Sequence, residues 1–178
     1  GTSWTERTSG TSNILMGVTY GNSTFVTVGS SGVILTSPDG TTWTERTSGT
    51  SRYRRYRGVT YVNGLYVTVG FSGIILTSTD GTTWTERTSG TKKNLLDIAY
   101  VNGLFVTVGS SGTILTSSDR TTWTERTSGT SEKLYVVTYG NGTFVVEGEN
   151  GTILTSLDGT TIKHIRSQVD LLGVTYSQ

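Results

Sequence analysis

An arginine- and tyrosine-rich run carries the clearest potential for chemistry in this sequence. It reads Arg52-Tyr53-Arg54-Arg55-Tyr56-Arg57. Guanidinium groups bind phosphates and carboxylates through paired hydrogen bonds, and aromatic rings between them offer stacking surfaces. The run therefore predicts a binding site for phosphate, carboxylate, nucleic acid or an acidic protein surface. A charged loop that is merely solvated has the same composition, so the run alone does not choose a ligand.

Residues for acid–base, nucleophilic or metal chemistry are scarce in the rest of the chain. His164 is the only histidine and there is no cysteine, so no zinc site can be assembled. No motif supports a serine–histidine–aspartate triad, and we expect His164 on an outer edge. We therefore expect a protein that is not an enzyme and uses no cofactor or metal. The net charge of +1 and the lack of a long apolar run predict neither a specific nucleic acid nor a membrane as partner.

The elements that must position these residues are internal repeats. The phrase Trp-Thr-Glu-Arg-Thr-Ser-Gly-Thr begins at Trp4, Trp43, Trp84 and Trp123, at spacings of 39, 41 and 39 residues, and a decayed copy begins at Ile162. A fixed period of this size is the signature of a repeat architecture. Recent natural duplication and deliberate design leave the same pattern, and the sequence favours neither.

One repeat divides into four short strands, which we expect at residues 15–20, 25–28, 33–36 and 42–47. Asn-Gly pairs stand between the first two strands in the later copies, and both residues tolerate the positive φ of a tight hairpin. Four antiparallel strands per repeat predict an all-β fold, a β-propeller of four-stranded blades. A β-solenoid with long parallel coils is the alternative.

The turn before the last strand resembles the Asp-box, or BNR, repeat family. The first copy reads Ser37-Pro38-Asp39-Gly40-Thr41-Thr42-Trp43, one residue shorter between Asp and Gly than the usual box, and a copy stands in every repeat. The resemblance implies a propeller in which each Asp has a structural role, accepting backbone N–H groups while the Trp packs over the turn. Asp-boxes also occur in sialidases, which makes a sialidase-like hydrolase remnant a remote alternative.

The repeats predict a single domain over residues 1–178 with incomplete ends. We expect an outer strand, four blades and the inner strand of an incomplete blade, at residues 1–10, 11–49, 50–90, 91–129, 130–167 and 168–178. Unfinished ends expose unpaired strand edges, which invite pairing with another chain. A homo-oligomer that completes one ring is therefore the expected partner. A structural or assembly protein with no ligand is the alternative to a binding function.

Comparison of the repeats with one another separates constant from variable positions. The strands, the Asn-Gly turns and the Asp turns barely change, whereas variation concentrates in the loop between repeats and in the loop between the second and third strands. In an up-and-down blade these two loops lie at the same end, which is where binding usually occurs on a rigid scaffold. We expect a binding module for a protein, glycan or other polyanion. Its candidate residues are Arg52, Tyr53, Arg54, Arg55, Tyr56, Arg57, Phe71, Lys92, Lys93, Glu132, Lys133 and Glu149.

One position inside the strands departs from the pattern. Glu147 stands where the other copies have Val28, Val69 and Val108. An unpaired buried carboxylate is costly. We therefore expect Glu147 to face the central channel, to find a partner, or to mark a distorted blade.

Overall fold

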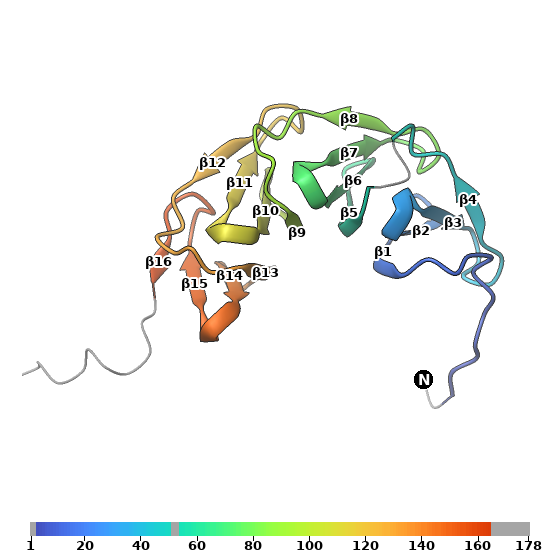
Figure 1. Cartoon of the computed structure of the whole chain (residues 1–178), viewed down its shortest axis with the longest axis horizontal. Coiled ribbons are helices and arrows are strands. Elements are labelled where there is room, and N and C mark those ends of the chain that lie inside the picture. Colours follow the sequence, from blue (N-terminus) through green and yellow to red (C-terminus); the bar gives the residue numbers. More distant parts are fainter. Residues whose placement is uncertain (1–2, 51–53, 165–178) are drawn as a thin grey trace, which may run out of the picture.

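Four β-sheets stand side by side in an open arc (Figure 1). This computed structural model describes residues 3–50 and 54–164. Each sheet has four antiparallel strands in sequence order, so the strands of one repeat form one blade. The propeller fold that the repeats predict is therefore confirmed, and the solenoid is not the fold.

The strands of a blade run from the inside of the arc to its outside. The first strands are β1 (Leu15–Gly21), β5 (Tyr56–Val62), β9 (Leu95–Val101) and β13 (Leu134–Gly140). The second strands are β2 (Thr24–Gly29), β6 (Leu65–Gly70), β10 (Leu104–Gly109) and β14 (Thr143–Gly148). The third strands are β3 (Ile34–Ser37), β7 (Ile75–Ser78), β11 (Ile114–Ser117) and β15 (Ile153–Ser156). The fourth strands are β4 (Thr44–Arg46), β8 (Thr85–Arg87), β12 (Thr124–Arg126) and β16 (Lys163–His164).

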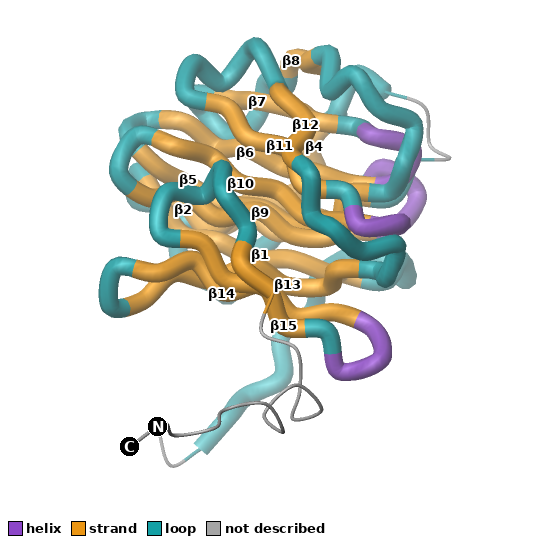
Figure 2. Tube along the Cα trace, turned by 90° about the vertical axis from the view of Figure 1, so that its left-hand side faces the viewer, coloured by secondary structure: helices purple, strands orange, loops and turns teal. Residues whose placement is uncertain are grey.

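Tight turns connect these strands and explain their short, fixed spacing. Asn63 and Gly64 have φ values of 48° and 78°, as a two-residue hairpin of the predicted kind requires. The second and third strands are joined by short 3-10 turns, which are η1 (Ser30–Gly32), η2 (Phe71–Gly73), η3 (Ser110–Gly112) and η4 (Glu149–Gly151). In the side view of Figure 2 these 3-10 turns share one end of the blades and the hairpins share the other.

The Asp turn before each fourth strand is held by its own carboxylate. Asp80 Oδ1 accepts the backbone N–H groups of Thr82 at 2.7 Å and Thr83 at 2.8 Å, and the hydroxyl of Ser78 at 2.9 Å. These hydrogen bonds hold the pKa of Asp80 well below its usual range. The other three turns repeat the arrangement, so the predicted turn clamp is confirmed in all four blades.

The hydrophobic core lies between blades rather than within them. Between the second and third blades, Val69 and Ile75 on one side pack against Leu95, Ile98 and Phe105 on the other. The same positions form the cores between the first and second and between the third and fourth blades. Each blade therefore has an outgoing face that covers the next blade and an incoming face that is covered by the previous one.

The two ends of the arc leave one face of each kind uncovered. On the incoming face of the first blade, Val18 is 63% exposed and Tyr20 and Leu15 are also exposed. On the outgoing face of the fourth blade, Ile153 is 48% exposed. The sequence predicts that Glu147 faces the central channel, finds a partner or marks a distorted blade. It lies beside Ile153 and is exposed, because no blade covers this face among the described residues.

The chain segments at both ends also differ from the expected strands. Residues 3–9 form no strand, and residues 3–8 are exposed throughout, because the sheet that they would complete is absent from the described residues. The inner strand expected at residues 168–178 lies outside the described residues. The expected fourth strand of each complete blade begins later than predicted, at Thr44 in the first blade.

Candidate recognition face

The two variable loops of each blade lie side by side, as predicted. The backbone N–H of Phe71 donates to the carbonyl of Arg55 at 2.8 Å, and that of Glu149 donates to the carbonyl of Lys133 at 2.8 Å. We call the surface formed by residues 12–14, 54–57, 92–94, 131–133 and turns η1 to η4 the variable face. The opposite end, with the hairpins and the Asp turns, is the constant face.

Within the described part of the Arg-Tyr run, Arg55 is the exposed residue, and it lies against Phe71 of turn η2. Arg55 is exposed, and its guanidinium carbon lies 5.7 Å from the centroid of the Phe71 ring. A cation over an aromatic face is held in place without losing its capacity to bind an anion. The pair comes from the two adjacent variable loops of the second blade, which explains why the two residues meet.

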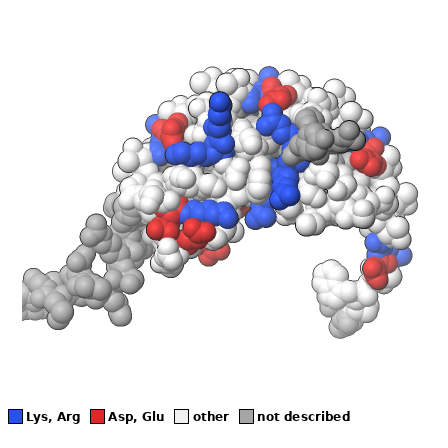
Figure 3. All heavy atoms as spheres, viewed as in Figure 1, with Lys and Arg blue, Asp and Glu red and all other residues white. Residues whose placement is uncertain are grey.

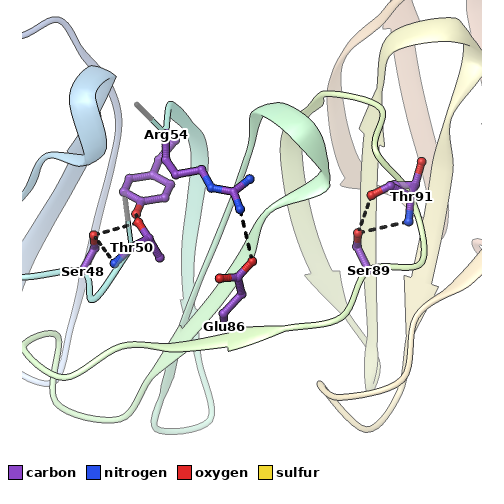
Figure 4. A network of polar contacts seen from close by, with 7 residues as sticks. Ser48, Thr50, Arg54, Glu86, Ser89 and Thr91 are labelled. Atoms are coloured by element: carbon purple, nitrogen blue, oxygen red, sulfur yellow. Dashed lines mark hydrogen bonds and ion pairs between the residues drawn. The ribbon is translucent and has the colours of Figure 1, made fainter. Parts of the chain in front are cut away.

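Two basic residues at equivalent positions of neighbouring blades point toward the outer strands. Arg54 Nη2 lies 3.6 Å from Glu86 Oε1 (Figure 4), and Lys93 Nζ lies 3.8 Å from Glu125 Oε1. All four side chains are at least one-third exposed, so each ion pair stabilises the fold only weakly. Arg54 and Lys93 therefore keep most of their capacity for an external anion.

The rest of the Arg-Tyr run does not form one surface. Tyr56 is fully buried between the first two blades, and its hydroxyl shares a hydrogen bond with Thr50 (Figure 4), so it belongs to the core and not to the binding surface. Arg57 is half-buried and its Nη1 lies 3.9 Å from Met16 Sδ. Arg52 and Tyr53 lie outside the described residues. The β-strand alternation that begins at Tyr56 turns it inward.

Asp97 is a half-buried carboxyl group that the sequence comparison did not single out. Its Oδ2 accepts the backbone N–H of Val137 at 3.0 Å, which joins the first strands of two neighbouring blades. Burial raises the pKa of Asp97, and this hydrogen bond and the positive charge of Arg57 act in the opposite direction. The sequence contained one signal that could have identified Asp97: the same position in the two earlier repeats is a glycine, Gly17 or Gly58.

The fourth blade carries a small acidic network on the variable face. Glu132 accepts a hydrogen bond of 2.7 Å from the Asn150 side-chain amide, and the Tyr135 hydroxyl donates to Glu149 at 2.8 Å. This contact with a carboxylate raises the pKa of Tyr135. Lys133 lies 5.0 Å from the centre of the Tyr135 ring. The sequence predicted Glu132, Lys133 and Glu149 here, but not Tyr135.

Charge is unevenly distributed over the variable face. Figure 3 shows lysine and arginine atoms over the middle of the arc and a gathering of acidic atoms over the fourth blade. An open depression of about 380 Å³ lies beside the basic region. Its lining includes Ser72, Glu86, Arg87 and the exposed Lys92. Positive charge and a concave surface thus lie together on the second and third blades.

The described residues hold no group of three or more histidine, cysteine, aspartate or glutamate side chains arranged for a metal ion. Within the same part of the chain, no helix is long and apolar enough to cross a membrane.

Comparison with known proteins agrees with the blade architecture. The family model described as the DUF6242 beta propeller domain matches residues 3–134. The chain belongs to this family. The matched range of the DUF6242 propeller ends at the start of the fourth blade, the blade with the decayed outer strand. No curated protein sequence matches the chain.

Solved structures show the same fold at low sequence identity. YCF48 bound to D1 peptide is 19% identical with a TM-score of 0.71, over 89% of this chain and 55% of YCF48. YCF48 from Cyanidioschyzon merolae is 20% identical with a TM-score of 0.68, over 88% of this chain and 58% of that one. The DUF6242 propeller chain thus spans a little more than half the length of these relatives.

Two further solved structures, one designed and one from an enzyme, share this fold. The computationally designed Ika4 protein is 12% identical with a TM-score of 0.65, over 88% of this chain and 94% of its own. A glycoside hydrolase is 9% identical with a TM-score of 0.55, over 82% of this chain and 46% of its own. At such identities the likeness concerns the fold alone.

Proposed function

We propose that this propeller is a non-enzymatic recognition module whose variable face binds acidic segments of proteins. The observation that carries the proposal is the gathering of Arg54, Arg55, Arg57, Lys92 and Lys93 over two neighbouring blades. Among the described residues only Arg54 and Lys93 of this set have an ion-pair partner. The positive charge is therefore available to an external anion on a rigid support.

A polypeptide is the partner class that the comparisons favour. YCF48, whose fold this chain shares, has been solved with a peptide bound. A glycan or another polyanion offers similar charge, and these are outcomes that the test below distinguishes. A sialidase-like activity has less support, because the Arg-Tyr run is confined to one blade and Tyr56 is buried. Turnover of a fluorogenic sialoside would overturn the non-enzymatic part of the proposal.

The test measures binding of a fluorescent poly-glutamate peptide by anisotropy at low ionic strength. The double variant Arg55→Ala/Lys92→Ala removes two exposed charges that make no ion pair among the described residues. We expect its affinity to fall roughly tenfold, which corresponds to about 1.4 kcal/mol, and the affinity of the unmodified chain to fall with added salt.

Arg120→Gly is the matched control, because it removes a positive charge from the constant face. We expect it to leave peptide affinity unchanged. Equal losses in both variants, or no binding of poly-glutamate at all, would contradict the proposal. Tighter binding of heparin than of poly-glutamate would assign the face to acidic glycans instead.

We also propose that the Asp turn is a shortened Asp-box and that the repeats have the boundaries given above. The contacts of Asp39, Asp80, Asp119 and Asp158 support the structural role that the box implies. Exchange of one complete repeat, residues 91–129, for residues 11–49 should preserve cooperative unfolding. Loss of folding in that chimera would refute the boundaries.

Self-association into a larger ring is a second function, favoured by the uncovered ends of the arc. The outgoing face of the fourth blade and the incoming face of the first are the two halves of an interface that the molecule already makes three times. Head-to-tail contact of two copies would cover Val18 and Ile153, whose counterparts Ile98 and Ile114 are buried. Burial of such residues is the dominant driving force for association.

Polar groups at the two ends of the arc could also form, between two copies, a hydrogen bond that the molecule already makes between its blades. Between blades, the Asn63 amide donates to the Tyr100 hydroxyl at 3.0 Å, and Asn141 and Tyr20 occupy these positions at the open ends. Glu147 opposes closure, because it replaces a valine that is buried in the other blades.

Mixing two variants tests the head-to-tail arrangement. Val18→Asp blocks the incoming face and Ile153→Asp blocks the outgoing face, so neither alone should close a two-chain ring. Mixed together, they retain one intact interface and should form a heterodimer in analytical ultracentrifugation. Failure of the mixture to associate, while the unmodified chain does, would indicate a symmetric contact and contradict this arrangement.

A further inference from the structure

The segment from Trp4 to Arg7 has the sequence of an outer strand but lies outside any sheet. It repeats the Trp-Thr-Glu-Arg phrase of β4, β8 and β12. Trp4 is 97% exposed, whereas Trp84 is 8% exposed and its indole N–H donates to the carbonyl of Gly81 at 3.1 Å. Figure 1 shows the segment leading away from the first blade toward the position that a preceding blade would fill.

The outer strand of the fourth blade differs in sequence from the outer strands of the other three blades, which share a Thr-Glu-Arg run. Within the described residues, β16 pairs with β15 through Lys163 opposite Thr155 and His164 opposite Leu154. The next position in this register lies opposite Ile153. In the three other blades that position is an arginine opposite an isoleucine, as in the pair of Ile114 and Arg126.

The outer strands of the other blades are also fixed by a side-chain hydrogen bond. Arg126 Nε donates to Thr116 Oγ1 at 2.8 Å, and the first two blades repeat this contact. Thr155 is the equivalent threonine of the fourth blade, and the sequence has isoleucine at the arginine position, residue 165. The fourth blade therefore presents an acceptor for an arginine that its own repeat does not supply.

We propose that Trp4–Arg7 of one copy joins β15 of a neighbouring copy as its outer strand, displacing β16. The proposal rests on the head-to-tail association proposed above. Arg7 then pairs with Ile153 and donates to Thr155, and Trp4 covers Phe144 and the turn at Gly159. Phe105 and Trp123 provide the pattern, with their ring centroids 6.2 Å apart. The partner of this edge is thus a strand of a second chain.

Chain connectivity allows strand donation and face-to-face docking to occur together. In the first blade, the four residues 47–50 follow Arg46 and lead into the second blade. The identical sequence at residues 8–11 follows Arg7 and leads into the first blade. A copy whose first blade docks on the neighbour's fourth blade therefore brings its Trp4–Arg7 segment to the outer edge of that blade, with the linker length that the fold already uses.

One contact opposes the donated strand. Glu6 would take the position of Glu125, whose neighbour Lys93 is replaced by Glu132 in the fourth blade. The two like charges would meet on an exposed rim, where water and salt weaken their repulsion. Glu132→Lys restores the pairing of the other blades, so it should strengthen donation.

Disulfide trapping between separately labelled chains tests the register of this contact. The protein contains no cysteine, so each single variant carries one thiol. Thr5 and Thr155 correspond to the strand pair formed by Thr124 and Thr116, and paired strand residues are close enough for a disulfide. After mixing Thr5→Cys with Thr155→Cys under mild oxidation, we expect a covalent dimer that reductant dissolves.

The matched control mixes Thr5→Cys with Thr116→Cys, because Thr116 already faces Thr124 within its own chain. We expect no covalent heterodimer there. If Thr155→Cys fails to fold, Arg7→Cys mixed with Ile153→Cys tests the neighbouring pair of the same register. Adding Glu132→Lys to the acceptor chain should raise the trapped fraction roughly twofold, as an exposed charge contact permits.

Each failure has a separate meaning. Equal trapping with Thr116→Cys would show random collision and overturn strand donation. An unmodified chain with twice the monomer mass, but no trapping in either register pair, would overturn donation and leave head-to-tail docking intact. An unmodified chain that stays monomeric would overturn both.

Discussion

The faces between blades and the faces at the two ends of the arc have nearly the same sequence and opposite surroundings. Ile114 is fully buried between the third and fourth blades, whereas Ile153, its counterpart one repeat later, is 48% exposed. Ile98 is 6% exposed and Val18 is 63% exposed at the matching position of the first blade. The apolar face of each blade is therefore buried by the neighbouring blade. The free energy of unfolding of such a chain is approximately a sum of contacts between adjacent blades.

A charged side chain at the position of Val108 and Glu147 should give the largest difference in stability between a covered face and an end face. Val108→Glu places an unpaired carboxylate in the core and should lower the free energy of unfolding by about 3–5 kcal/mol. The reverse change at the open end, Glu147→Val, should leave the unfolding of dilute chain within about 0.5 kcal/mol of the original. It should also strengthen self-association.

Urea unfolding at low concentration and sedimentation at high concentration measure these two effects separately. A large gain of stability from Glu147→Val in dilute solution would show that the end face is already covered within one chain, because the change would then remove a buried carboxylate.

Truncation of the matched isoleucines gives the next contrast. Ile114→Ala leaves a cavity between blades and should cost about 2–5 kcal/mol. Ile153→Ala removes a side chain that is half in water, so its cost in the isolated chain should be well below that. Equal costs, measured by urea unfolding at low concentration, would mean that the end face contributes as an interior face does.

The Asp turns should stabilise interior and end blades equally, because their hydrogen bonds lie within one blade. Each carboxylate has a folded pKa below the unfolded value of about 3.9. Their stabilisation is therefore present above pH 4 and is lost as the pH falls toward the folded pKa. Asp97, whose pKa is raised, opposes this loss.

The melting temperature should therefore fall on acidification from pH 5 to pH 3. Asp80→Asn in an interior blade and Asp158→Asn in the end blade should lower the melting temperature at pH 7 by similar amounts. A much smaller effect at Asp158 would show that the turn depends on a neighbouring blade.

A single turn residue should have the smallest effect. Arg120 has a φ of 72°, where the other three Asp turns have glycine. Arg120→Gly relieves the strain of a side chain in the left-handed region and should stabilise the chain by roughly 0.5–1 kcal/mol. Thermal unfolding measures this change, and a loss of stability would mean that the Arg120 side chain makes a compensating contact.

The sequence predicted those features that depend on local chemistry. The Asn-Gly hairpins, the Asp turn contacts and the four-stranded blades follow from residues within one repeat, and all were confirmed. Burial between blades depends on the neighbouring blade. Glu147 was expected to face the central channel, to find a partner or to mark a distorted blade, and it is instead exposed on an end face that no described blade covers. Tyr56 was assigned to the binding loop, but it is the first residue of β5 and occupies the position of Leu95 and Leu134, which are buried between blades.

The candidate site shows the same division. Loop adjacency could be predicted from the up-and-down order of the strands, and it places Arg55 against Phe71. The contact of Asp97 with the backbone of Val137 joins two blades and has no signal within a single repeat. Contacts of that kind require the relative placement of blades, which a repeat pattern does not contain.

The mass of the unmodified chain in solution tests most directly whether the open ends are two halves of one interface. Light scattering coupled to size exclusion at micromolar concentration measures this mass. Two chains that complete a ring predict twice the mass of one chain, and Val18→Asp should return it to that of one chain. A single-chain mass for the unmodified protein across the micromolar range would contradict the account.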